Sequence, residues 1–433
     1  MKKALFWHRR DLRFEDNAGL FQAQKKADVV QAVFIFDTTI LDKLLKNDQR
    51  IIFIHRSIQN LKKEYQRFGG DLKVYHGDPK ELIPKIAKEL KVDSVYTNRD
   101  YEPYALERDK FIFDKLKTLS IDFIGAKDNV IFEKSEITKA DGLPYTIYTP
   151  YSRKWKEKMS EFYLSSYPNG EYSKKIAKST RENLITLKEM GFDDKELVPF
   201  PSDDYPKKWM AKYGENRNYP AIEGGTSHLG VHLRFGTISI RQLARKAEQT
   251  DPTFLNELIW RDFYQAIIYH FPHSVKGSFK KQYDAIEWEN NEVEFQSWRE
   301  GKTGYPLVDA GMRELNETGY MHNRVRMVVA SFLVKHLLID WRWGETYFAE
   351  KLLDFDLASN VGGWQWAAGS GCDAAPYFRV FNPTAQLEKF DKKLVYVKKW
   401  VPEFGTDEYP EPIVEHKMAR ERVLKRYKLA LNN

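Results

Sequence analysis

The chain is almost free of cysteine, and this scarcity limits what it can be. Among its 433 residues there is one Cys, Cys372. Neither a disulfide framework nor a four-cysteine iron–sulfur cluster can form within one such chain. This usage is typical of a reducing compartment, so we expect a cytoplasmic protein, and we expect no metal site.

Long apolar runs are also missing. The longest, residues 327–341, is interrupted by Lys335, His336 and Asp340, which argues against a membrane-spanning helix. The apolar run near the start of the chain is too short for a signal peptide. We therefore expect no association with a membrane.

Glycine is missing where a dinucleotide-binding sheet needs it. In the first third of the chain, short apolar segments alternate with helical patterns, which is typical of a parallel α/β sheet. The first strand-to-helix turn, Trp7-His8-Arg9-Arg10-Asp11-Leu12-Arg13, contains no Gly, so the nicotinamide fingerprint is absent. The predicted strands are residues 4–7, 29–36, 72–75, 92–96 and 121–124, and the predicted helices are 50–68, 79–90 and 104–119.

The rest of the chain has a different pattern, and its length exceeds what one hydrophobic core usually serves. We predict an α/β N-terminal domain with a parallel Rossmann-like sheet over 1–126, an interdomain connector over 127–200 and an all-α domain over 201–433. The connector is polar and rich in Tyr and Lys, whereas strand signals almost vanish past Tyr205. The predicted helices there are 240–248, 253–269, 306–316, 321–339 and 346–353, with a basic helical tail at 417–428.

Aromatic and basic residues are plentiful. Aromatic residues make up 14% of the chain, and nine of the eleven Trp follow residue 200, so we expect stacking chemistry in the C-terminal half. The net charge of +7 is compatible with a polyanionic partner at a local basic patch, but it does not demand one.

The most informative segment is Asn360-Val361-Gly362-Gly363-Trp364-Gln365-Trp366, followed by Asp373-Ala374-Ala375-Pro376-Tyr377-Phe378-Arg379. Residues two apart on a helix do not face each other, so Trp364 and Trp366 should enter different surroundings. The segment resembles the flavin-gripping core of the DNA photolyase and cryptochrome family. Further similarity, from Phe6 to beyond Pro383, includes Thr303-Gly304-Tyr305-Pro306 and Val308-Asp309-Ala310.

This resemblance implies the photolyase/cryptochrome architecture, with an antenna-type domain over 1–126 and a helical FAD- and DNA-binding catalytic domain over 201–433. It implies a photo-lyase, a carbon–carbon lyase, that repairs cyclobutane pyrimidine dimers in UV-damaged DNA. Excited reduced FAD, one per chain and bound non-covalently as the anion, would give an electron to a flipped-out dimer. The implied protein is a monomer of the bacterial cytosol or nucleoid. The alternatives are a cryptochrome-like blue-light photoreceptor without repair activity and a dark flavin oxidoreductase.

One candidate cofactor segment is Thr226-Ser227-His228-Leu229-Gly230. Hydroxyls and consecutive backbone N–H groups at a helix start can form a phosphate cradle, although Thr or Ser as a simple N-cap is commoner. By the resemblance, this segment grips the flavin pyrophosphate. Gly230 replaces a Ser of the family pattern, and Tyr213 contacts the flavin.

Two acids, Asp354 and Asp356, lie in an apolar setting. Buried carboxylates need partners, and Arg326 is the candidate; a pair of helix caps is the alternative. By the resemblance, both acids face the isoalloxazine ring, Arg326 pairs with Asp354, and Asn360 lies beside flavin N5. A neutral amide at that position favours repair over signalling.

Trp364, Trp341 and Trp288 match the tryptophan triad that carries electrons from the surface of these proteins to a photo-oxidised flavin. For any single one of them, ordinary core packing is the alternative. The agreement of all three with the family pattern favours the relay.

A candidate DNA site begins with Glu257 and Trp260, which are three residues apart and share a helical face. Stacking on an aromatic side chain stabilises a base by roughly 1–3 kcal/mol, so Trp260 and Trp366 could offset the cost of base flipping. By the resemblance, Glu257 donates a hydrogen bond to the dimer, and burial should raise its pKa. A solvated surface acid is the alternative for Glu257.

The lesion type is predicted from His322-Asn323-Arg324-Val325-Arg326-Met327. Enzymes that reverse (6-4) photoproducts carry two His where this chain has Asn323 and Met327, so cyclobutane dimers are the expected substrate. Arg324 is expected to hold a flanking phosphate. The other DNA contacts implied by the resemblance are Arg261, Tyr264, Trp366 and Gln386.

A second, antenna chromophore is possible but is not identified by the sequence. In folate-using relatives an Asn-Glu pair holds the pigment, and Tyr104 and Ala105 stand there in this chain. Folate is therefore not expected, and a deazaflavin, another flavin or no antenna stay open.

Overall fold

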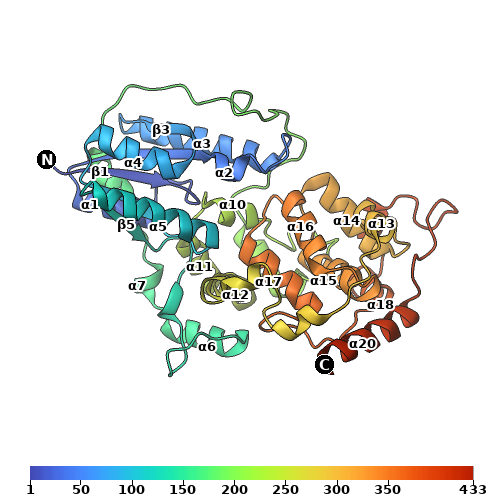
Figure 1. Cartoon of the computed structure of the whole chain (residues 1–433). Coiled ribbons are helices and arrows are strands. Elements are labelled where there is room, and N and C mark those ends of the chain that lie inside the picture. Colours follow the sequence, from blue (N-terminus) through green and yellow to red (C-terminus); the bar gives the residue numbers. More distant parts are fainter. Residues whose placement is uncertain (433) are drawn as a thin grey trace. The chain divides into compact units, whose positions relative to one another are not determined.

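A computed structural model of the chain describes residues 1–432. The N-terminal part forms a five-stranded parallel sheet (Figure 1). The spatial order β3-β2-β1-β4-β5 is that of a doubly wound α/β fold. The predicted strands are confirmed, with the last two displaced by one or two residues. The strands are β1 (Lys3–His8), β2 (Val29–Asp37), β3 (Leu72–Gly77), β4 (Ser94–Asn98) and β5 (Asp122–Ala126).

Alternation along β1 explains why helices cover both faces of this sheet. Phe6 packs in one hydrophobic layer with α1 (Ala18–Lys26) and α3 (Gln49–Arg67). Its neighbours Leu5 and Trp7 pack in a second layer with residues of α4 (Pro79–Leu90) and α5 (Pro103–Thr118). Successive side chains of a strand point to opposite faces, so a continuous apolar run fills both layers.

The chain packs as two compact units. The α/β unit comprises residues Met1–Glu136, Trp155–Asp204 and Leu229–Gln249. The helical unit comprises Ile137–Lys154, Tyr205–His228 and Thr250–Asn433. The predicted domain limits at residues 126 and 200 stay a prediction, because compact packing units and functional domains need not coincide.

Short elements complete the α/β unit. Arg241, on α11 (Ile240–Glu248), is buried and pairs with Asp16 at 2.9 Å and Asp128 at 2.7 Å. These ion pairs attach the segment Leu229–Gln249 to the loop before α1 and to the segment after β5. This unit also contains α2 (Thr38–Leu41), α7 (Glu161–Leu164), α10 (Gly230–Phe235) and two 3-10 helices, Lys134–Glu136 and Asn169–Lys175.

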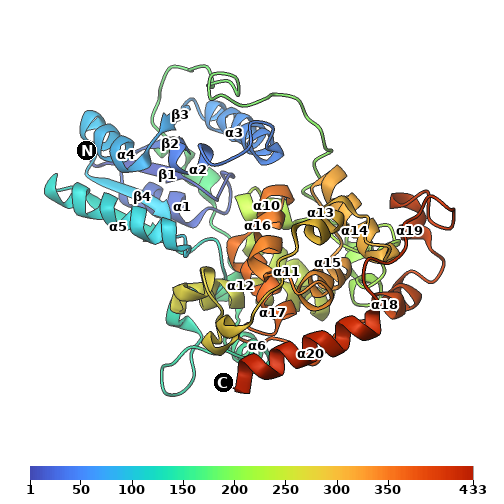
Figure 2. The ribbon, with the colours of Figure 1, turned by 45° about the vertical axis from the view of Figure 1, so that its right-hand side comes forward.

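The helical unit contains the elements that carry most of the predicted site (Figure 2). Helix α6 (Tyr148–Lys158) starts in this unit. The longer helices are α12 (Pro252–His270), α13 (Glu292–Glu300), α14 (Pro306–Thr318), α15 (Asn323–Ser331), α16 (Trp341–Lys351), α17 (Leu357–Ala368), α18 (Pro383–Phe390) and α20 (His416–Asn432). The short ones are α8 (Lys207–Met210), α9 (Tyr213–Asn216) and α19 (Val395–Trp400).

Two helix predictions need correction. The predicted helix 321–339 is broken: α15 ends at Ser331, a π-helical turn follows over Phe332–His336, and Leu338 has a φ of +50°. The π turn directs Lys335 inward, where its Nζ donates to the Ala368 carbonyl at 3.3 Å. The predicted helix 346–353 begins at Trp341 instead, because Asp340 caps it by accepting from the Arg342 N–H at 3.0 Å.

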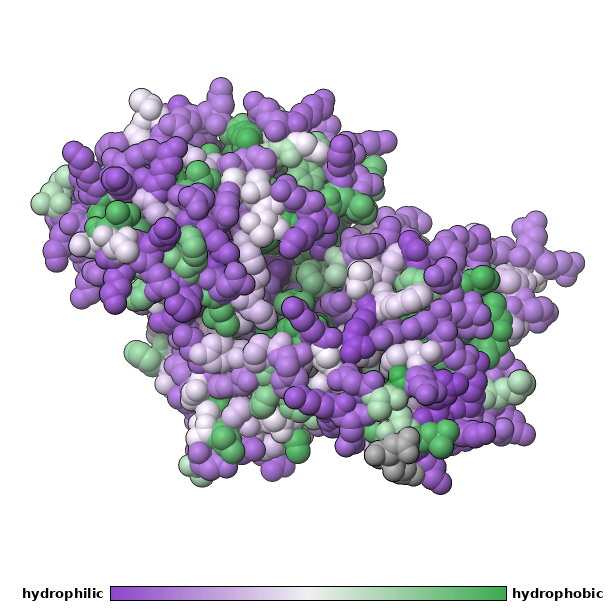
Figure 3. Space-filling view, in the orientation of Figure 1, coloured by the Kyte–Doolittle hydropathy of each residue, from purple (hydrophilic) through white to green (hydrophobic). Residues whose placement is uncertain are grey.

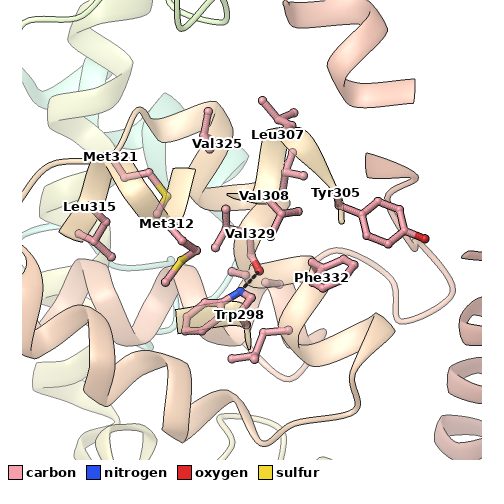
Figure 4. Packing of buried hydrophobic residues seen from close by; sticks show 14 of the residues in the cluster. Trp298, Tyr305, Leu307, Val308, Met312, Leu315, Met321, Val325, Val329 and Phe332 are labelled. Atoms are coloured by element: carbon pink, nitrogen blue, oxygen red, sulfur yellow. Dashed lines mark hydrogen bonds between the residues drawn. The ribbon is translucent and has the colours of Figure 1, made fainter. Parts of the chain in front are cut away.

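The core of the helical unit is formed largely by α14, α15, the π-helical turn Phe332–His336, α16 and α17, with Trp298 of α13 packed among them. Figure 4 shows the Trp298 indole directed at the Val329 carbonyl, to which its Nε1 donates at 3.3 Å. Helices α14 and α15 approach closely at Gly311, where a Cβ atom would lie 2.4 Å from Val325 Cγ1. This core supports the helices that carry the site.

The surface is mainly polar. In Figure 3 hydrophilic residues dominate the visible face, and hydrophobic residues are scattered or in small groups. Among residues 1–432, the helices are all too short or too polar to cross a bilayer.

Candidate active site

Helix α12 presents Glu257, Trp260 and Tyr264 on one side. It begins where the Asp251 carboxylate accepts from the Thr253 and Phe254 N–H groups, at 2.7 and 2.9 Å. Pro252 occupies the first turn, where its missing N–H does not matter. The three side chains are partly exposed, while their helix is buried on its opposite side. The predicted common face of Glu257 and Trp260 is therefore present.

Glu257 is not an ordinary solvated acid. Its side chain is 30% exposed and forms an ion pair with Arg217. Burial raises the pKa of Glu257, as expected from the sequence, while the charge and hydrogen bond of Arg217 oppose this shift. Sequence reasoning missed Arg217, because the partner lies forty residues earlier, on a different segment.

Trp260 has an aromatic partner that the sequence did not indicate. Its ring is parallel to the Tyr148 ring, with the centroids 3.7 Å apart and the planes 4° apart. Tyr264 is tilted against Trp260 at 5.4 Å. Tyr264 also lies on Gly362 of α17, where a Cβ atom would be 2.3 Å from the Tyr264 ring. This close approach joins α12 to α17.

Helix α17 positions Asp356 and Asn360 one turn apart. Asp356 caps the helix, accepting from the Ser359 N–H at 3.1 Å, and also accepts from Gln265 Nε2 at 3.1 Å. Asp356 is thus the N-cap of α17, and its expected place beside the flavin ring stays a prediction. Asn360 Nδ2 donates to the Glu345 carbonyl at 3.0 Å and to its Oε1 at 2.8 Å. Burial raises the pKa of Glu345, and the bond from Asn360 opposes this; sequence reasoning missed Glu345.

The predicted pair of Arg326 and Asp354 is present. Arg326 Nη2 lies 3.0 Å from Asp354 Oδ2, and its Nε donates to the Met321 carbonyl at 2.7 Å. Burial disfavours the charged guanidinium, but the Asp354 carboxylate outweighs it, and the pKa of Arg326 is raised. The Arg326 guanidinium is thus held by Asp354 on one side and by the Met321 carbonyl on the other.

The predicted phosphate cradle is divided after His228, because Leu229 and Gly230 belong to the α/β unit. Leu229 is the N-cap of α10 and makes no side-chain capping bond, so the simple Thr/Ser cap is not what forms there. Thr226 Oγ1 lies 3.0 Å from the Tyr320 hydroxyl, and the His228 ring packs on Tyr320 with centroids 4.0 Å apart.

The remaining cofactor candidates lie nearby in the chain. Ser227 is partly exposed beside Thr226. Tyr213 is 9% exposed and packs edge-on against Phe254 at 5.0 Å. Burial raises the pKa of Tyr213, and the nearby Glu257 carboxylate adds to this.

The two tryptophans of the central motif enter different surroundings, as predicted. Trp364 is 2% exposed, whereas Trp366 is partly exposed and packs against Phe381 at 6.3 Å. Trp364 and Trp341 belong to one hydrophobic cluster, and Trp288 packs against it. Trp298 packs edge-on against Trp364, with the ring centroids 6.1 Å apart.

The N-terminus of α15 carries Asn323, Arg324 and Met327. Asn323 is exposed, and Arg324 Nη2 donates to Asn218 Oδ1 at 2.7 Å. The Arg324 guanidinium also lies 4.6 Å from the Phe390 ring centroid and donates to Met327 Sδ at 3.7 Å. The Arg324 side chain, which we predict to contact a phosphate, is thus held in place by Asn218, Phe390 and Met327.

Other predicted DNA contacts come from several elements. Arg261 is on α12, next to Trp260, and Gln386 is on α18. The relay candidate Trp288 lies between α12 and α13 in sequence. Gln386 and Trp288 therefore belong to segments outside the group α12, α15 and α17 that carries most of the site.

Buried polar atoms of that group that have no hydrogen-bond partner among residues 1–432 include Gln265 Oε1 on α12, His322 Nε2 at the start of α15 and Trp364 Nε1 on α17. Leaving a buried polar group unpaired costs about 1–3 kcal/mol. Together with the ion pair of Arg326 and Asp354, these atoms fit a ligand that carries hydrogen-bonding groups.

Two family models and many curated relatives match this chain. Residues 4–169 match the family model of DNA photolyase, and residues 254–407 match the FAD-binding domain of DNA photolyase. A deoxyribodipyrimidine photo-lyase of Synechococcus sp. is 37% identical, over 96% of this chain and 95% of the relative.

Solved structures extend the likeness to the whole fold. A bacterial class III photolyase from Agrobacterium tumefaciens has a TM-score of 0.87 at 32% identity, covering 100% of this chain and 98% of that one. An archaeal photolyase from Sulfolobus tokodaii with two FAD molecules has a TM-score of 0.84 at 33% identity, covering 99% and 100%. A doubly wound sheet with a helical FAD-binding domain defines a flavoprotein of the photolyase/cryptochrome class. The chain belongs to the DNA photolyase family.

Proposed function

We propose that the protein is a cyclobutane pyrimidine dimer photolyase, a carbon–carbon lyase that acts on UV-damaged DNA in light. The observation that carries this proposal is the arrangement on α12, where Glu257 lies one turn before Trp260 on a partly exposed face. Such a face offers a stacking plane and a hydrogen-bonding carboxyl to two joined bases that have flipped out of the duplex. The photo-lyase names of the curated relatives support the same activity.

The proposed cofactor site uses residues that already have fixed positions. Arg326, Asp354 and Asp356 would bind the flavin end of FAD, with Asn360 beside its N5 atom. Tyr213 and the segment Thr226-Ser227-His228-Leu229-Gly230 would bind its ribityl and phosphate parts. When bound and reduced, FAD supplies the light-excited electron. Glu345 keeps the Asn360 amide in one orientation through two hydrogen bonds.

The chain's own residues then hold the lesion. Trp260 and Trp366 would stack on the two joined pyrimidines, and Glu257, whose pKa is raised by burial, would donate a hydrogen bond to a lesion carbonyl. Arg324 would contact a flanking phosphate, with further DNA contacts from Arg261, Tyr264 and Gln386. Asn323 and Met327 supply no general acid, which favours cyclobutane dimers over (6-4) products.

A separate role is proposed for Trp364, Trp341 and Trp288. An indole is readily oxidised, and the first two share one buried cluster against which the third packs. We assign them the relay that restores the reduced cofactor, with Trp288 as the outermost member.

A second chromophore of a kind other than folate is proposed for the α/β unit. At the folate position of relatives, Tyr104 donates to Asp37 Oδ2 at 2.7 Å, and Ala105 is buried. Burial raises the pKa of Tyr104 to about 12, and its bond to Asp37 adds to the shift. Both positions are thus engaged within the protein itself. The two FAD molecules of the Sulfolobus tokodaii structure make a second flavin the first pigment to test.

The test is a repair assay with the purified protein after chemical reduction of its flavin. An oligonucleotide with one thymine dimer is incubated in blue light or in the dark, and intact thymines are quantified by chromatography. We expect repair in the light and none in the dark. We also expect the protein to elute as a monomer in size-exclusion chromatography. Unrepaired dimers in light, with flavin spectral changes intact, would instead favour the cryptochrome-like photoreceptor.

A further inference from the structure

We propose that Tyr148 is a positioning residue of the lesion site: it covers one face of Trp260 and leaves the other face for a base. This inference rests on the proposed function, because it concerns how the substrate is oriented. Tyr148 is the first residue of α6, whereas Trp260 lies on α12. Both belong to the helical unit.

The contact is an unusually complete stack. The two ring centroids are 3.7 Å apart and the planes differ by 4°. Free aromatic pairs prefer offset or edge-to-face arrangements over a parallel sandwich, because their π faces repel. A parallel stack at this distance therefore implies that other contacts hold the two rings together.

Those contacts are hydrogen bonds at both ends of Tyr148. Its hydroxyl donates to the Asn256 carbonyl on α12 at 2.9 Å, and its backbone N–H donates to Asp373 Oδ2 at 3.1 Å. Phe263 of α12 adds an edge contact to the Tyr148 ring at 5.9 Å. The ring is thus fixed relative to α12 independently of the stack.

The bond to Asp373 connects the stack to the other half of the site. Asp373 follows α17 in sequence, seven residues after Trp366. It accepts from the first N–H of α6, one of the groups that a helix leaves unpaired, and a carboxylate is favourable at that end. Tyr148 thereby links the helix that carries Trp260 to the segment that follows Trp366.

Two consequences follow for binding. First, the face of Trp260 that Tyr148 covers is closed to a base, so a flipped base would stack on the opposite face and the dimer would have one orientation. Second, the Trp260 side chain is already immobilised before DNA binds, so its ordering cost is not incurred on association. Loss of the Tyr148 ring should weaken binding of damaged DNA more than it changes the splitting step.

The experiment compares Tyr148→Ala and Tyr148→Phe with Tyr145→Ala as the matched control. Tyr145 lies three residues earlier and packs edge-on against Tyr151, with the ring centroids 6.4 Å apart. Dissociation constants are measured with dimer-containing and undamaged oligonucleotides, and repair yield per photon is measured at saturating substrate. Flavin content and thermal unfolding are recorded for each variant.

We expect Tyr148→Ala to weaken binding of the dimer by about fivefold, the effect of freeing one large side chain. Its binding of undamaged DNA and its repair yield at saturation should stay near wild type. Tyr148→Phe keeps the ring and should restore most of the affinity. If the alanine variant loses flavin, Asp373→Asn provides the second test, with a smaller loss of affinity in the same direction.

Several results would overturn the inference. If Tyr148→Ala bound dimer-containing DNA as tightly as Tyr145→Ala does, the stack would not orient the lesion. Tighter binding by Tyr148→Ala would mean that Tyr148 occupies the face that the base needs. If Tyr148→Phe bound dimer-containing DNA as weakly as Tyr148→Ala does, the aromatic ring would not be the group that supports binding. A wild-type protein that neither binds nor repairs dimers would refute the proposed function itself, which is a separate outcome.

Discussion

At the scale of single residues, the carboxyl groups of the site differ in whether a positively charged partner offsets the cost of their burial. Asp354 is paired with Arg326 at 3.0 Å, so its charge is compensated. Glu257 is paired with Arg217, yet burial prevails and its pKa is raised. Glu345 accepts a hydrogen bond from the neutral Asn360 amide, and its pKa is also raised by burial. The site can therefore keep acids in their protonated form at a higher pH than free side chains would.

Glu257 gives a pH prediction. Because its pKa is raised above the ordinary value of 4.5, its protonated, donating form persists to higher pH and is lost as pH increases through the raised pKa. Repair yield at saturating substrate should therefore fall as pH rises through that range. Glu257→Gln, which keeps a donor at every pH, should flatten the profile, and Glu257→Ala should lower the yield by about tenfold. Equal pH profiles for wild type and Glu257→Gln would contradict this role.

Trp364 gives a spectroscopic prediction. Trp364→Phe should abolish light-driven reduction of the oxidised protein, measured as loss of flavin absorbance in the presence of a thiol, because phenylalanine is not readily oxidised. Repair by chemically reduced Trp364→Phe should remain near wild type. Trp298→Phe is the control, since Trp298 packs against Trp364 at 6.1 Å but is not part of the proposed relay. Loss of both reduction and repair in Trp364→Phe would indicate a structural role instead.

Much of the site was predictable residue by residue, because the chemistry lies in short motifs. The pair of Arg326 and Asp354, the common face of Glu257 and Trp260 and the different surroundings of Trp364 and Trp366 all follow from spacing or from the resemblance. Arg217, Glu345 and Tyr148 were not found, since each contacts the site from another segment. Long-range pairing leaves no periodic signal in a sequence, so only the folded structure reveals these partners.

At the scale of secondary structure elements, the sheet was predicted well and the helices less well. Buried parallel strands are continuous apolar runs bounded by turns, whereas a long apolar run does not show where a helix breaks. Residues 321–339 were predicted as one helix, but the structure divides this segment with a π turn and caps the next helix at Asp340. Helix α17 carries the most informative motif and still has an ordinary signal at both ends, with Asp356 as N-cap and Gly369 as C-cap.

The contact between α16 and α17 gives a stability prediction. At Gly344 a Cβ atom would lie 2.1 Å from the Trp364 ring, so Gly344→Ala should lower the free energy of unfolding by about 1–3 kcal/mol. At Gly363, also helical, an added Cβ would meet nothing within 4 Å. Gly363→Ala should therefore be neutral or raise stability by about 0.5–1 kcal/mol. Urea denaturation measures both, and similar losses in the two variants would contradict the packing argument.

Helix α20 gives a second pH prediction. His416, at its start, contacts the buried His336, whose Nε2 lies 2.9 Å from His416 Nδ1. Burial lowers the pKa of His336 to about 3, from 6.5. The unfolded chain therefore binds a proton that the folded protein excludes, so stability is full above pH 6.5 and falls as the pH is lowered. Urea denaturation is measured from about pH 7.5 to about pH 5.5, roughly one unit on either side of the ordinary histidine pKa. Over this range the free energy of unfolding of His336→Gln should depend less on pH than that of the wild type. An unchanged dependence would assign the effect to other groups.

At the scale of the whole molecule, charge sets how the protein meets DNA. The net charge of +7 is modest, so affinity should depend on a few local contacts rather than on a general positive field. Arg324 is such a contact, with its guanidinium held by Asn218 and Phe390.

Arg324 gives the corresponding prediction. Arg324→Ala should weaken binding to damaged and undamaged DNA alike and should reduce the slope of log affinity against log salt by about 1, as for loss of one phosphate contact. The measurement is fluorescence anisotropy at several salt concentrations, with Arg299→Ala as a control, since Arg299 packs on Tyr347 and Phe295. A loss restricted to damaged DNA would mean that Arg324 contacts the lesion rather than the backbone.

The way the chain is divided between its two units has a practical outcome. It passes from one unit to the other five times, after Glu136, Lys154, Asp204, His228 and Gln249. One of these passages falls inside α6, between Lys154 and Trp155. No single cut separates the units, so neither half should be recoverable as a freestanding fragment. Attempts to study the α/β unit alone, or to graft the helical unit onto another carrier, should therefore begin from the intact polypeptide.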